Sequence, residues 1–349
     1  MSSVASRVGI SLPMLNQPAR ALQHLAHLAD ESGFDSLWDY EFFRNPFITH
    51  ALNAGVTRNI ALATGIATAA GRTPFEMANA AADVDELSGG RAILGVGLGG
   101  AGWTDIYNGA DLSHPVPRIR EYVTGLRAVW DHFTTGDNFA VDGKYVQLSS
   151  PVMNPWGGRE LARPRIPIYL AALKPGMLRL AGEIGDGVIG YLNTPSFIDG
   201  HVRPHVAEGA ARVGRDPAEV DIASLILCAI SEDREMARRI ARINVGNYVA
   251  FPVSWTVIDY MGLQDERDAV LQALMTDGIG ALESATSDRL LDTFAICGTP
   301  DEALEQFAAL DGRLPHIVLH TPYVPPISGA DSAESFRTVC DTMAKAFAG

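Results

Sequence analysis

Two carboxylates alternate with aromatic rings in residues 38–44, which read Trp-Asp-Tyr-Glu-Phe-Phe-Arg. The segment follows a short apolar run that is typical of a β-strand. Carboxylates that face a ligand site can donate or accept a proton, so Asp39 and Glu41 are candidates for proton transfer. The structural alternative is that Asp39 caps a turn and Glu41 pairs with Arg44.

A second candidate site lies at residues 173–177, Leu-Lys-Pro-Gly-Met, directly after another apolar run. Proline is common at the first position of a helix, so a helix is expected to begin at Pro175. The N-H groups of a helix start have no partner within the helix, and they attract anions. Together with Lys174 they predict a seat for an anion such as a phosphate.

Two glycine-rich segments follow two further apolar runs. Residues 65–71 are small and neutral, and such residues allow a flat ring to approach the backbone closely. Residues 95–100, Gly-Val-Gly-Leu-Gly-Gly, resemble a dinucleotide-binding loop only superficially, because no helix opens directly after them and no acidic ribose ligand follows. Close packing inside a barrel is the preferred interpretation of these glycines.

The histidines do not predict a metal site. Metal-dependent hydrolases with a barrel fold usually carry a His-x-His pair at the end of the first strand, where this chain has Ile10-Ser11-Leu12. His316 and His320 could share a strand face, and a structural role is favoured for them. His114 differs because it lies in a loop over the predicted mouth of the barrel. A Gly-x-Ser-x-Gly elbow and a P-loop are both absent from the sequence.

Short β-branched runs alternate with helical patterns along the whole chain, which predicts a closed parallel (β/α)8 barrel rather than an open sheet. Threonine, proline and glutamate at 73–76 and again at 299–302 mark two helix starts. Strands are expected at residues 8–12, 35–38, 60–66, 92–97, 168–172, 187–191, 221–231 and 317–320. Helices are expected near residues 21–33, 74–88, 118–133, 175–185 and 333–347.

The chain is predicted to be one domain over residues 1–349. An excursion at about 138–165 contains a hairpin with its turn at 141–144, and a helical insertion spans about 251–298. Barrels of this kind hold their active sites at the C-terminal ends of the strands, so the segments described above would meet at one mouth.

The composition excludes several functions. A formal charge of -14 argues against binding to nucleic acid or to anionic lipid, both of which need a basic face. No signal peptide or membrane-spanning run is evident. Three widely spaced cysteines fit a reduced, cytoplasmic protein.

In its ordered motifs the sequence resembles the bacterial-luciferase-like superfamily, in particular the branch that uses the deazaflavin coenzyme F420. The resemblance covers nearly the whole chain. The motifs that carry it are residues 33–38 with Glu41, Pro46 and Phe47, then 72–74, 87–91, 94–97, 113–115, 120–122, 169–172, 180–183 and 186–187.

This resemblance implies a (β/α)8 barrel with insertion segments that transfers a hydride between F420 and a small organic substrate at the barrel mouth. It also implies a non-prolyl cis peptide at Gly65-Ile66 that presses on the cofactor ring. Residues 171–177 would form the phosphate turn, although the usual Gly-Pro-basic order appears here as Lys174-Pro175-Gly176.

The site residues are assigned on this basis. Glu41 and His114 are the expected catalytic residues, on the substrate side of the ring, where Glu41 would handle a proton. Trp38, Asp39 and Trp103 are expected to contact the substrate, and no metal ligand is expected. The expected cofactor-binding residues are Gly65, Ile66, Ala67, Thr68, Gly97, Gly99, Ala171, Ala172, Leu173, Lys174, Pro175, Gly176 and Met177.

Two other functions stay open: an FMN-dependent monooxygenase of the same superfamily, and a barrel that binds a flavin-like ligand without catalysis. An alcohol, a sugar phosphate, a pterin and an activated alkene are all open as substrates. The resemblance also implies a homodimer.

Overall fold

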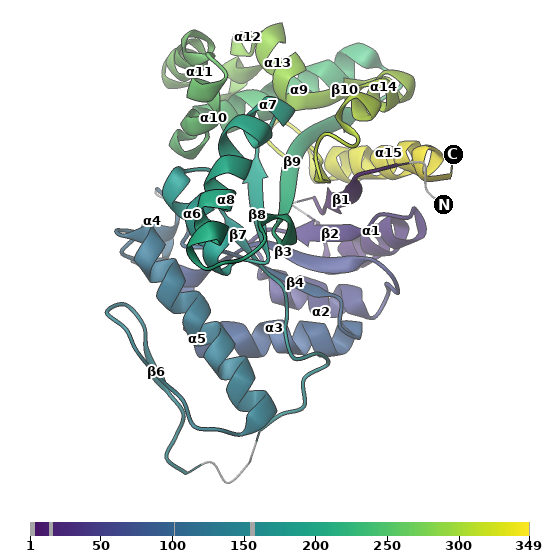
Figure 1. Cartoon of the computed structure of the whole chain (residues 1–349). Helices are drawn as coiled ribbons and strands as arrows, with labels where there is room; N and C mark the ends of the chain where they lie inside the picture. The colour runs from purple at the N-terminus through teal and green to yellow at the C-terminus, as the bar shows by residue number, and fades with distance from the viewer. Residues whose placement is uncertain (1–3, 14–16, 101, 154–157, 349) are drawn as a thin grey trace.

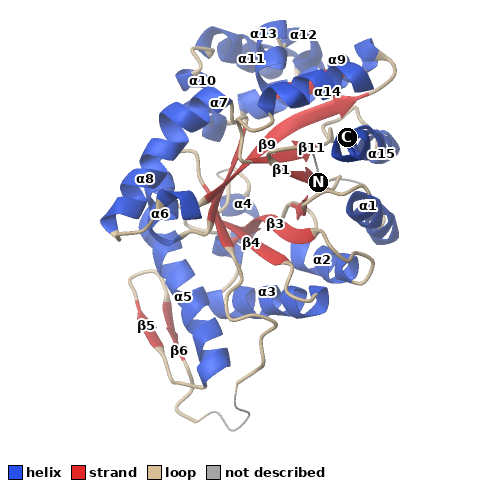
Figure 2. Ribbon diagram, turned by 45° about the vertical axis from the view of Figure 1, so that its right-hand side comes forward, coloured by secondary structure: helices blue, strands red, loops and turns tan. Residues whose placement is uncertain are grey.

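The computed structural model describes residues 4–13, 17–100, 102–153 and 158–348. Its parallel strands close into a barrel, and helices surround the strands (Figures 1 and 2). The (β/α)8 barrel predicted from the sequence is therefore confirmed. The barrel strands, in chain order, are β1 (Arg7–Ser11), β2 (Ser36–Asp39), β3 (Ala61–Thr68), β4 (Ala92–Gly97), β7 (Ile168–Ala171), β8 (Gly187–Tyr191), β9 (Asp221–Ile230) and β11 (His316–His320).

Helices connect these strands. They are α1 (Ala19–Glu31), α2 (Pro46–Ala54), α3 (Pro74–Ser88), α4 (Thr104–Asn108), α5 (Pro115–Thr135), α6 (Pro175–Ile184), α7 (Pro195–Phe197), α8 (Arg203–Arg212), α9 (Arg234–Ala250), α10 (Trp255–Tyr260), α11 (Gln264–Asp277), α12 (Leu282–Ala285), α13 (Asp288–Phe294), α14 (Pro300–Leu310) and α15 (Gly329–Ala348). Short 3-10 or π turns occupy Ala69–Gly71, Ile198–Val202, Pro217–Glu219, Pro252–Ser254 and Ile279–Ala281.

The two predicted helix starts are confirmed. The Thr73 hydroxyl accepts the N-H of Glu76, and the Thr299 hydroxyl accepts the N-H of Glu302, whose carboxylate returns to the Thr299 N-H. These bonds satisfy N-H groups that a helix start would otherwise leave unpaired. Helix α2 was not predicted, although Asn45 caps its start and Pro46 occupies its first position.

Two segments extend beyond the barrel. Strands β5 (Ala140–Asp142) and β6 (Gln147–Ser149) form the predicted antiparallel hairpin, which projects beside α5 (Figure 1). Its turn lies at residues 143–146 rather than 141–144, because Val141 and Asp142 pair with β6. Residues 154–157 of the predicted excursion lie outside the described residues. Helices α9–α13 gather at the opposite end of the molecule (Figure 1), followed by β10 (Ala295–Gly298), which pairs with the last residues of β9. Strand β10 was not predicted, because its residues fall within the segment expected to be a helical insertion.

The interior of the barrel is a packed core rather than a channel. Its side chains come from alternate positions of different strands, as in other barrels of this type. They are Trp38, Ala63, Ile93, Tyr169, Ile189, Ala223, Leu225 and Val318. A larger apolar layer fills the space between the strands and the surrounding helices.

A polar network centred on Asp221 closes the N-terminal end of the barrel. The Asp221 carboxylate accepts hydrogen bonds from Tyr169 (2.7 Å), Arg7 (2.9 Å) and His316 (2.9 Å). The other ring nitrogen of His316 lies 2.8 Å from the Ser36 hydroxyl. Burial alone would raise the pKa of Asp221, but the hydrogen bond from His316 and the Arg7 charge hold it at about 2.

We predict that Asp221→Asn lowers the free energy of unfolding by about 2 to 3 kcal/mol near neutral pH, because the stabilised charge is lost. The folded-state pKa is depressed, so the contribution is present above the ordinary pKa of 3.8 and is lost as the pH falls toward about 2. Urea unfolding should therefore show a difference from the unmodified protein that narrows below a pH of about 4. The control is Glu219→Gln, an exposed surface pair with Arg215; equal destabilisation by both variants would contradict the assignment.

Candidate active site at the barrel mouth

The strands are parallel, so their C-terminal ends meet at one mouth, which is where enzymes of this fold hold their active sites. The segments that the sequence analysis identified after β2, β3, β4 and β7 all start at this end. The mouth has two parts of different chemistry. Small residues dominate the ends of β3, β4 and β7, and tyrosines and a histidine lie at the ends of β2, β8 and β11.

The small-residue part is built around an irregularity in β3. The pairing of β3 with β4 shifts register between Thr64 and Ala67, which is a β-bulge. A side chain at Gly97 would lie 2.7 Å from Ile66 Cγ2 and 3.2 Å from Ala171 Cβ, so these three residues adjoin and Gly97 has to be glycine. Ile66, Thr68 and Ala171 are partly exposed here.

Two predictions about this part are corrected. The peptide between Gly65 and Ile66 is trans, and the cis peptide found among the described residues is Pro325–Pro326. The bulge itself leaves the regular strand path without a cis bond. Ala67 is fully buried in the outer apolar layer, so its side chain does not face the mouth.

Gly65 accommodates a ring, but that ring belongs to the protein. A side chain at Gly65 would lie 2.1 Å from Tyr40 Cε1, so the Tyr40 ring packs directly on the Gly65 backbone. From the sequence, Gly65 was expected to contact a cofactor ring instead. The partly exposed residues next to the bulge are therefore Ile66, Thr68 and Ala171, with Gly97 buried beside Ile66 and Ala171.

The start of α6 has the properties expected of an anion seat. Lys174 is exposed and precedes the helix, and no side chain caps the helix start. The preceding carbonyl, that of Leu173, lies 3.0 Å from His201 Nε2, which fixes the turn. Ala172 and Leu173 themselves are buried, so only the later residues of the predicted phosphate turn can reach a ligand with their side chains.

Glu41 does not pair with Arg44. Its Oε2 atom accepts the Thr68 N-H at 2.7 Å and lies 2.6 Å from Arg72 Nη1. These contacts tie the loop after β2 to the end of β3. Arg72 also lies 3.4 Å from Glu76, at the start of α3. Glu41 therefore has a positioning contact with the bulged strand in addition to its predicted place at the mouth.

His114 and Trp103 lie in the connection from β4 to α5. His114 is exposed and adopts a positive φ of 54°, and Val116, two residues later, approaches Gly176 at the start of α6. The Trp103 ring stacks on Phe42 with the ring centroids 4.1 Å apart and an angle of 11° between the planes. This stack joins the loops after β2 and β4 at the rim. Gly99, at a φ of 119°, packs on Thr104 rather than on the mouth surface.

The structure separates the adjacent residues Trp38 and Asp39. Trp38 is fully buried in the barrel interior, and its Nε1 donates to Ser36 toward the N-terminal end. A direct substrate contact for Trp38 is therefore wrong, because side chains alternate along a strand and this one points into the core. Asp39 is 4% exposed, and its Oδ2 atom has no hydrogen-bond partner among the described residues. Burial raises the pKa of Asp39 to about 6.

The tyrosine and histidine part of the mouth was not predicted as a site. His316 and His320 do share a face of β11, as expected, but His320 lies at the C-terminal end. Its ring is surrounded by Tyr40, Tyr248 and Tyr323. The sequence signal that could have identified this part is His320, a polar residue at the end of a predicted barrel strand. Tyr248 lies on α9, and no sequence pattern connects that helix to β11.

Unpaired polar atoms at the mouth fit the presence of a ligand. Buried polar atoms almost always have hydrogen-bond partners in folded proteins, so exceptions require an explanation. Four side-chain atoms without a partner among the described residues lie at the C-terminal ends of β2, β8 and β11. They are Asp39 Oδ2, Tyr40 Oη, Asn193 Oδ1 and Thr321 Oγ1. Together with the glycine-lined bulge and the uncapped α6, they fit a flat, polar cofactor with an anionic tail.

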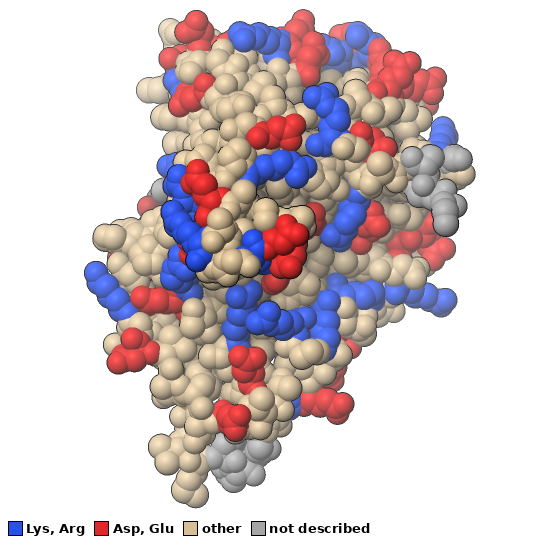
Figure 3. All heavy atoms as spheres, viewed as in Figure 1, with Lys and Arg blue, Asp and Glu red and all other residues tan. Residues whose placement is uncertain are grey.

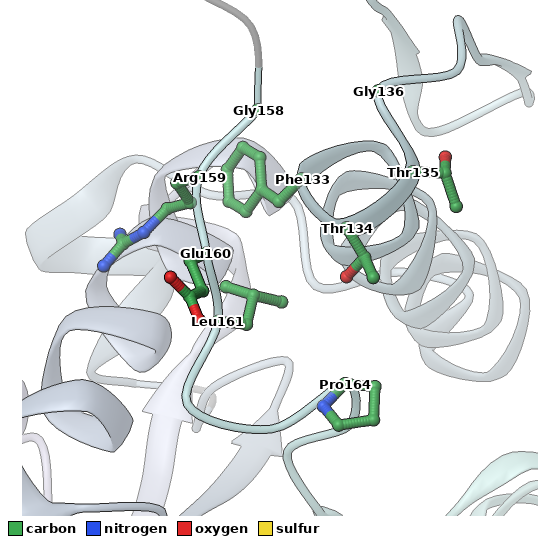
Figure 4. A pocket seen from close by; sticks show the side chains of 9 residues that line it. All are labelled: Phe133, Thr134, Thr135, Gly136, Gly158, Arg159, Glu160, Leu161 and Pro164. Atoms are coloured by element: carbon green, nitrogen blue, oxygen red, sulfur yellow. The ribbon is translucent and has the colours of Figure 1, made fainter.

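Other parts of the surface offer less. A hollow of about 490 Å³ lies between the end of α5 and residues 158–164 (Figure 4), away from the strand ends. Figure 3 shows acidic and basic side chains interspersed over one face of the molecule. Within the described ranges, no group of three or more His, Cys, Asp or Glu residues could hold a metal ion, and no helix is long and apolar enough to cross a membrane.

A closed parallel barrel with a bulged third strand and a polar mouth at its C-terminal end defines a barrel enzyme that binds a flat cofactor. The family model described as luciferase-like monooxygenase matches residues 3–316, and the chain belongs to this family.

Individual relatives are also similar over their full length. The chain is 32% identical to a 5,10-methylenetetrahydromethanopterin reductase of Methanolobus tindarius, over 89% of this chain and 93% of that protein. The structure of a coenzyme F420-dependent tetrahydromethanopterin reductase from Methanopyrus kandleri superposes with a TM-score of 0.80 at 25% identity and covers 99% of both chains. The FMN-bound oxygenating constituent of 3,6-diketocamphane monooxygenase from Pseudomonas putida shares the fold, with a TM-score of 0.66, 19% identity and 98% coverage of both chains.

Proposed function

We propose that this protein is an F420-dependent oxidoreductase that transfers a hydride between the deazaflavin and a small organic substrate at the barrel mouth. The observation that carries this proposal is the similarity to the F420-dependent reductase of Methanopyrus kandleri over 99% of both chains. The uncapped helix start and the unpaired polar atoms of the mouth support it independently.

Different residues would bind the ring and the anionic tail of such a cofactor. The ring would lie on the partly exposed side chains of Ile66 and Ala171, which adjoin the buried Gly97. The anionic tail would reach the N-H groups at the start of α6 beside Lys174. The bound cofactor would give or accept the hydride, and the protein would orient the reactants and manage the proton. Asp39 is suited to the latter, because a carboxyl group with a pKa of about 6 changes its protonation state near physiological pH.

An FMN-dependent monooxygenase is the second candidate. It is favoured by the description of the family and by the shared fold of the FMN-bound Pseudomonas putida protein. FMN also carries a flat ring and a phosphate, so the same surfaces would hold it.

Titration of the purified protein with F420 and with FMN, followed by fluorescence, separates the candidates. We expect tight binding of F420 and weak binding of FMN. Preferential binding of FMN, with oxygen-dependent turnover when the flavin is reduced, would support the monooxygenase. A protein that binds F420 but exchanges no hydride with any substrate would be a ligand-binding barrel.

We predict that Lys174→Ala weakens F420 binding about fivefold to tenfold, because one cation is removed from the anion seat. The loss should shrink as salt concentration rises, since exposed charges are screened. Lys345→Ala, at an exposed position on α15, is the matched control and should leave the dissociation constant unchanged. An unchanged constant for Lys174→Ala would remove Lys174 from the cofactor site.

We also propose that the protein is a homodimer. Exposed apolar side chains lie on the neighbouring helices α2 and α3, and a second copy would cover them. They are Ile48 and Leu52 on α2, and Phe75 and Leu87 on α3. Sedimentation of the purified protein as a monomer would contradict this proposal.

A further inference from the structure

The ring of His320 is fully buried at the mouth and has a hydrogen-bond partner at each nitrogen. Its Nδ1 atom lies 2.5 Å from the Ser11 hydroxyl at the end of β1, and its Nε2 atom lies 2.9 Å from the Tyr248 hydroxyl on α9. Burial lowers the pKa of His320 to about 3, so the ring is neutral. A neutral imidazole has one N-H and one acceptor nitrogen, and its partners decide which is which.

The Ser11 hydroxyl decides which ring nitrogen of His320 carries the proton. Ser11 is fully buried, and His320 is the hydrogen-bond partner of its hydroxyl among the described residues. If the hydroxyl accepted an N-H from Nδ1, its own proton would be left buried without an acceptor, which costs about 1 to 3 kcal/mol. Ser11 therefore donates to Nδ1, and the proton of the ring is on Nε2.

The order of donation then continues outward. With its proton on Nε2, His320 donates to the Tyr248 oxygen, and the Tyr248 O-H is free to donate further. Burial raises the pKa of the Tyr248 hydroxyl well above its ordinary value, so the hydroxyl keeps its proton. The Tyr323 ring lies edge-on to the Tyr248 ring, with the centroids 6.4 Å apart.

The far end of this chain lies among unpaired polar atoms. Tyr323 is held in place because the side chain of Asn244, on α9, accepts the N-H groups of Tyr323 and Val324. The Tyr40 ring meets the edge of His320 at 5.5 Å between centroids, and its buried hydroxyl has no partner among the described residues. Thr321, directly after His320, is 1% exposed and also has an unpaired hydroxyl.

We propose that Ser11, His320 and Tyr248 form an ordered chain of hydrogen-bond donors that, with Tyr40, binds a carbonyl or hydroxyl oxygen of an uncharged ligand group at the mouth. Ser11 and His320 are positioning residues, since both are fully buried, and the tyrosine hydroxyls make the contact. A neutral array of this kind suits an oxygen acceptor, because it carries no charge to balance a buried ion. The proposal rests on the proposed function for the reaction that the site serves. The oxygen belongs either to the substrate or to a carbonyl of the cofactor ring.

The first test is the tautomer of His320, which does not depend on activity. Nitrogen NMR of the 15N-histidine-labelled protein distinguishes the two ring nitrogens, and the His320→Gln variant identifies the signals by their loss. We expect a protonated Nε2 and an unprotonated Nδ1. A protonated Nδ1 would reverse the order of donation and overturn the proposal.

The second test compares Tyr248→Phe with Tyr191→Phe. Tyr191 packs beside Tyr248, with ring centroids 5.1 Å apart, but is not a member of the donor chain, so it is the matched control. Loss of one neutral hydrogen bond should weaken ligand binding about threefold to tenfold. The ligands are F420, followed by fluorescence, and cyclohexanone as a carbonyl probe, followed by saturation-transfer NMR.

Weaker binding of cyclohexanone by Tyr248→Phe alone would assign the oxygen to the substrate, and weaker binding of F420 would assign it to the cofactor. Unchanged binding of both ligands, or equal losses in Tyr191→Phe, would overturn the proposal. If the unmodified protein does not bind F420, the proposed function fails, whereas the tautomer and the cyclohexanone titration still decide whether the donor chain exists.

Discussion

Replacing Asp39 with Asn is expected to raise the free energy of unfolding by about 2 to 3 kcal/mol at a pH of about 7.5, while turnover falls about a hundredfold. Asp39 is 4% exposed, and burial raises its pKa to about 6. The folded-state pKa lies above the ordinary value of 3.8, so the carboxyl group stabilises the fold while it is protonated. That stability is lost as the pH rises through about 6.

Urea unfolding at several pH values measures this effect. The gain in stability of Asp39→Asn should be largest above a pH of about 6 and should vanish near a pH of about 4, where the carboxyl group is protonated in both states. Asp341→Asn, an exposed carboxylate on α15, serves as the control and should show no such dependence. A destabilised Asp39→Asn variant at neutral pH would show that the carboxylate has a favourable partner in the folded protein.

The expected loss of turnover follows from the same burial. A carboxyl group whose pKa lies near the working pH can both give and take a proton, and Asn can do neither. The pH profile of turnover should lose a step near about 6 in the variant, if turnover of the variant is measurable. Full activity of Asp39→Asn would remove Asp39 from proton transfer and leave the orphaned Oδ2 atom as a binding group.

Replacing Glu41 with Gln is the second substitution for which we predict a large effect, in this case on cofactor binding and turnover. Glu41 Oε2 accepts the Thr68 N-H and contacts Arg72 at 2.6 Å. From the sequence alone, this substitution is expected to reduce turnover far more than cofactor affinity, because Glu41 handles a proton. The structure revises the expectation: both the Thr68 N-H and Arg72 bind the Glu41 carboxylate, and its replacement releases the end of the bulged strand.

We therefore expect Glu41→Gln to weaken F420 binding and to lower turnover together, each about tenfold or more, because a partly buried ion pair is broken. Fluorescence titration and steady-state kinetics measure the two effects. Glu76→Gln is the matched control, since Glu76 also contacts Arg72 but has no bond to Thr68 and is about half exposed. A loss of turnover with unchanged F420 affinity would restore the role of Glu41 in proton transfer.

Much of the fold was predictable because local patterns carry it. Alternating apolar runs located the barrel strands, and the Thr-Pro-x-Glu segments located the starts of α3 and α14. The position of Lys174 directly before α6 was also predictable, since Pro175 marks the helix start. The unpaired N-H groups of such a start attract anions wherever the helix lies in the fold. The family resemblance predicted a cis bond at Gly65-Ile66, and the structure has a trans bond there.

The sequence by itself determined which segments meet at the mouth, because in a parallel barrel the segments that follow the strands all begin at the same end. It could not determine which of them contact one another. Glu41 and Arg72, which form an ion pair, are 31 positions apart, and Tyr40 and Gly65, which pack together, are 25 positions apart. In the hydrogen-bonded chain, His320 is 309 positions from Ser11 and 72 positions from Tyr248. Such contacts depend on barrel closure and on the direction in which each side chain leaves its strand, and only the tertiary structure decides these.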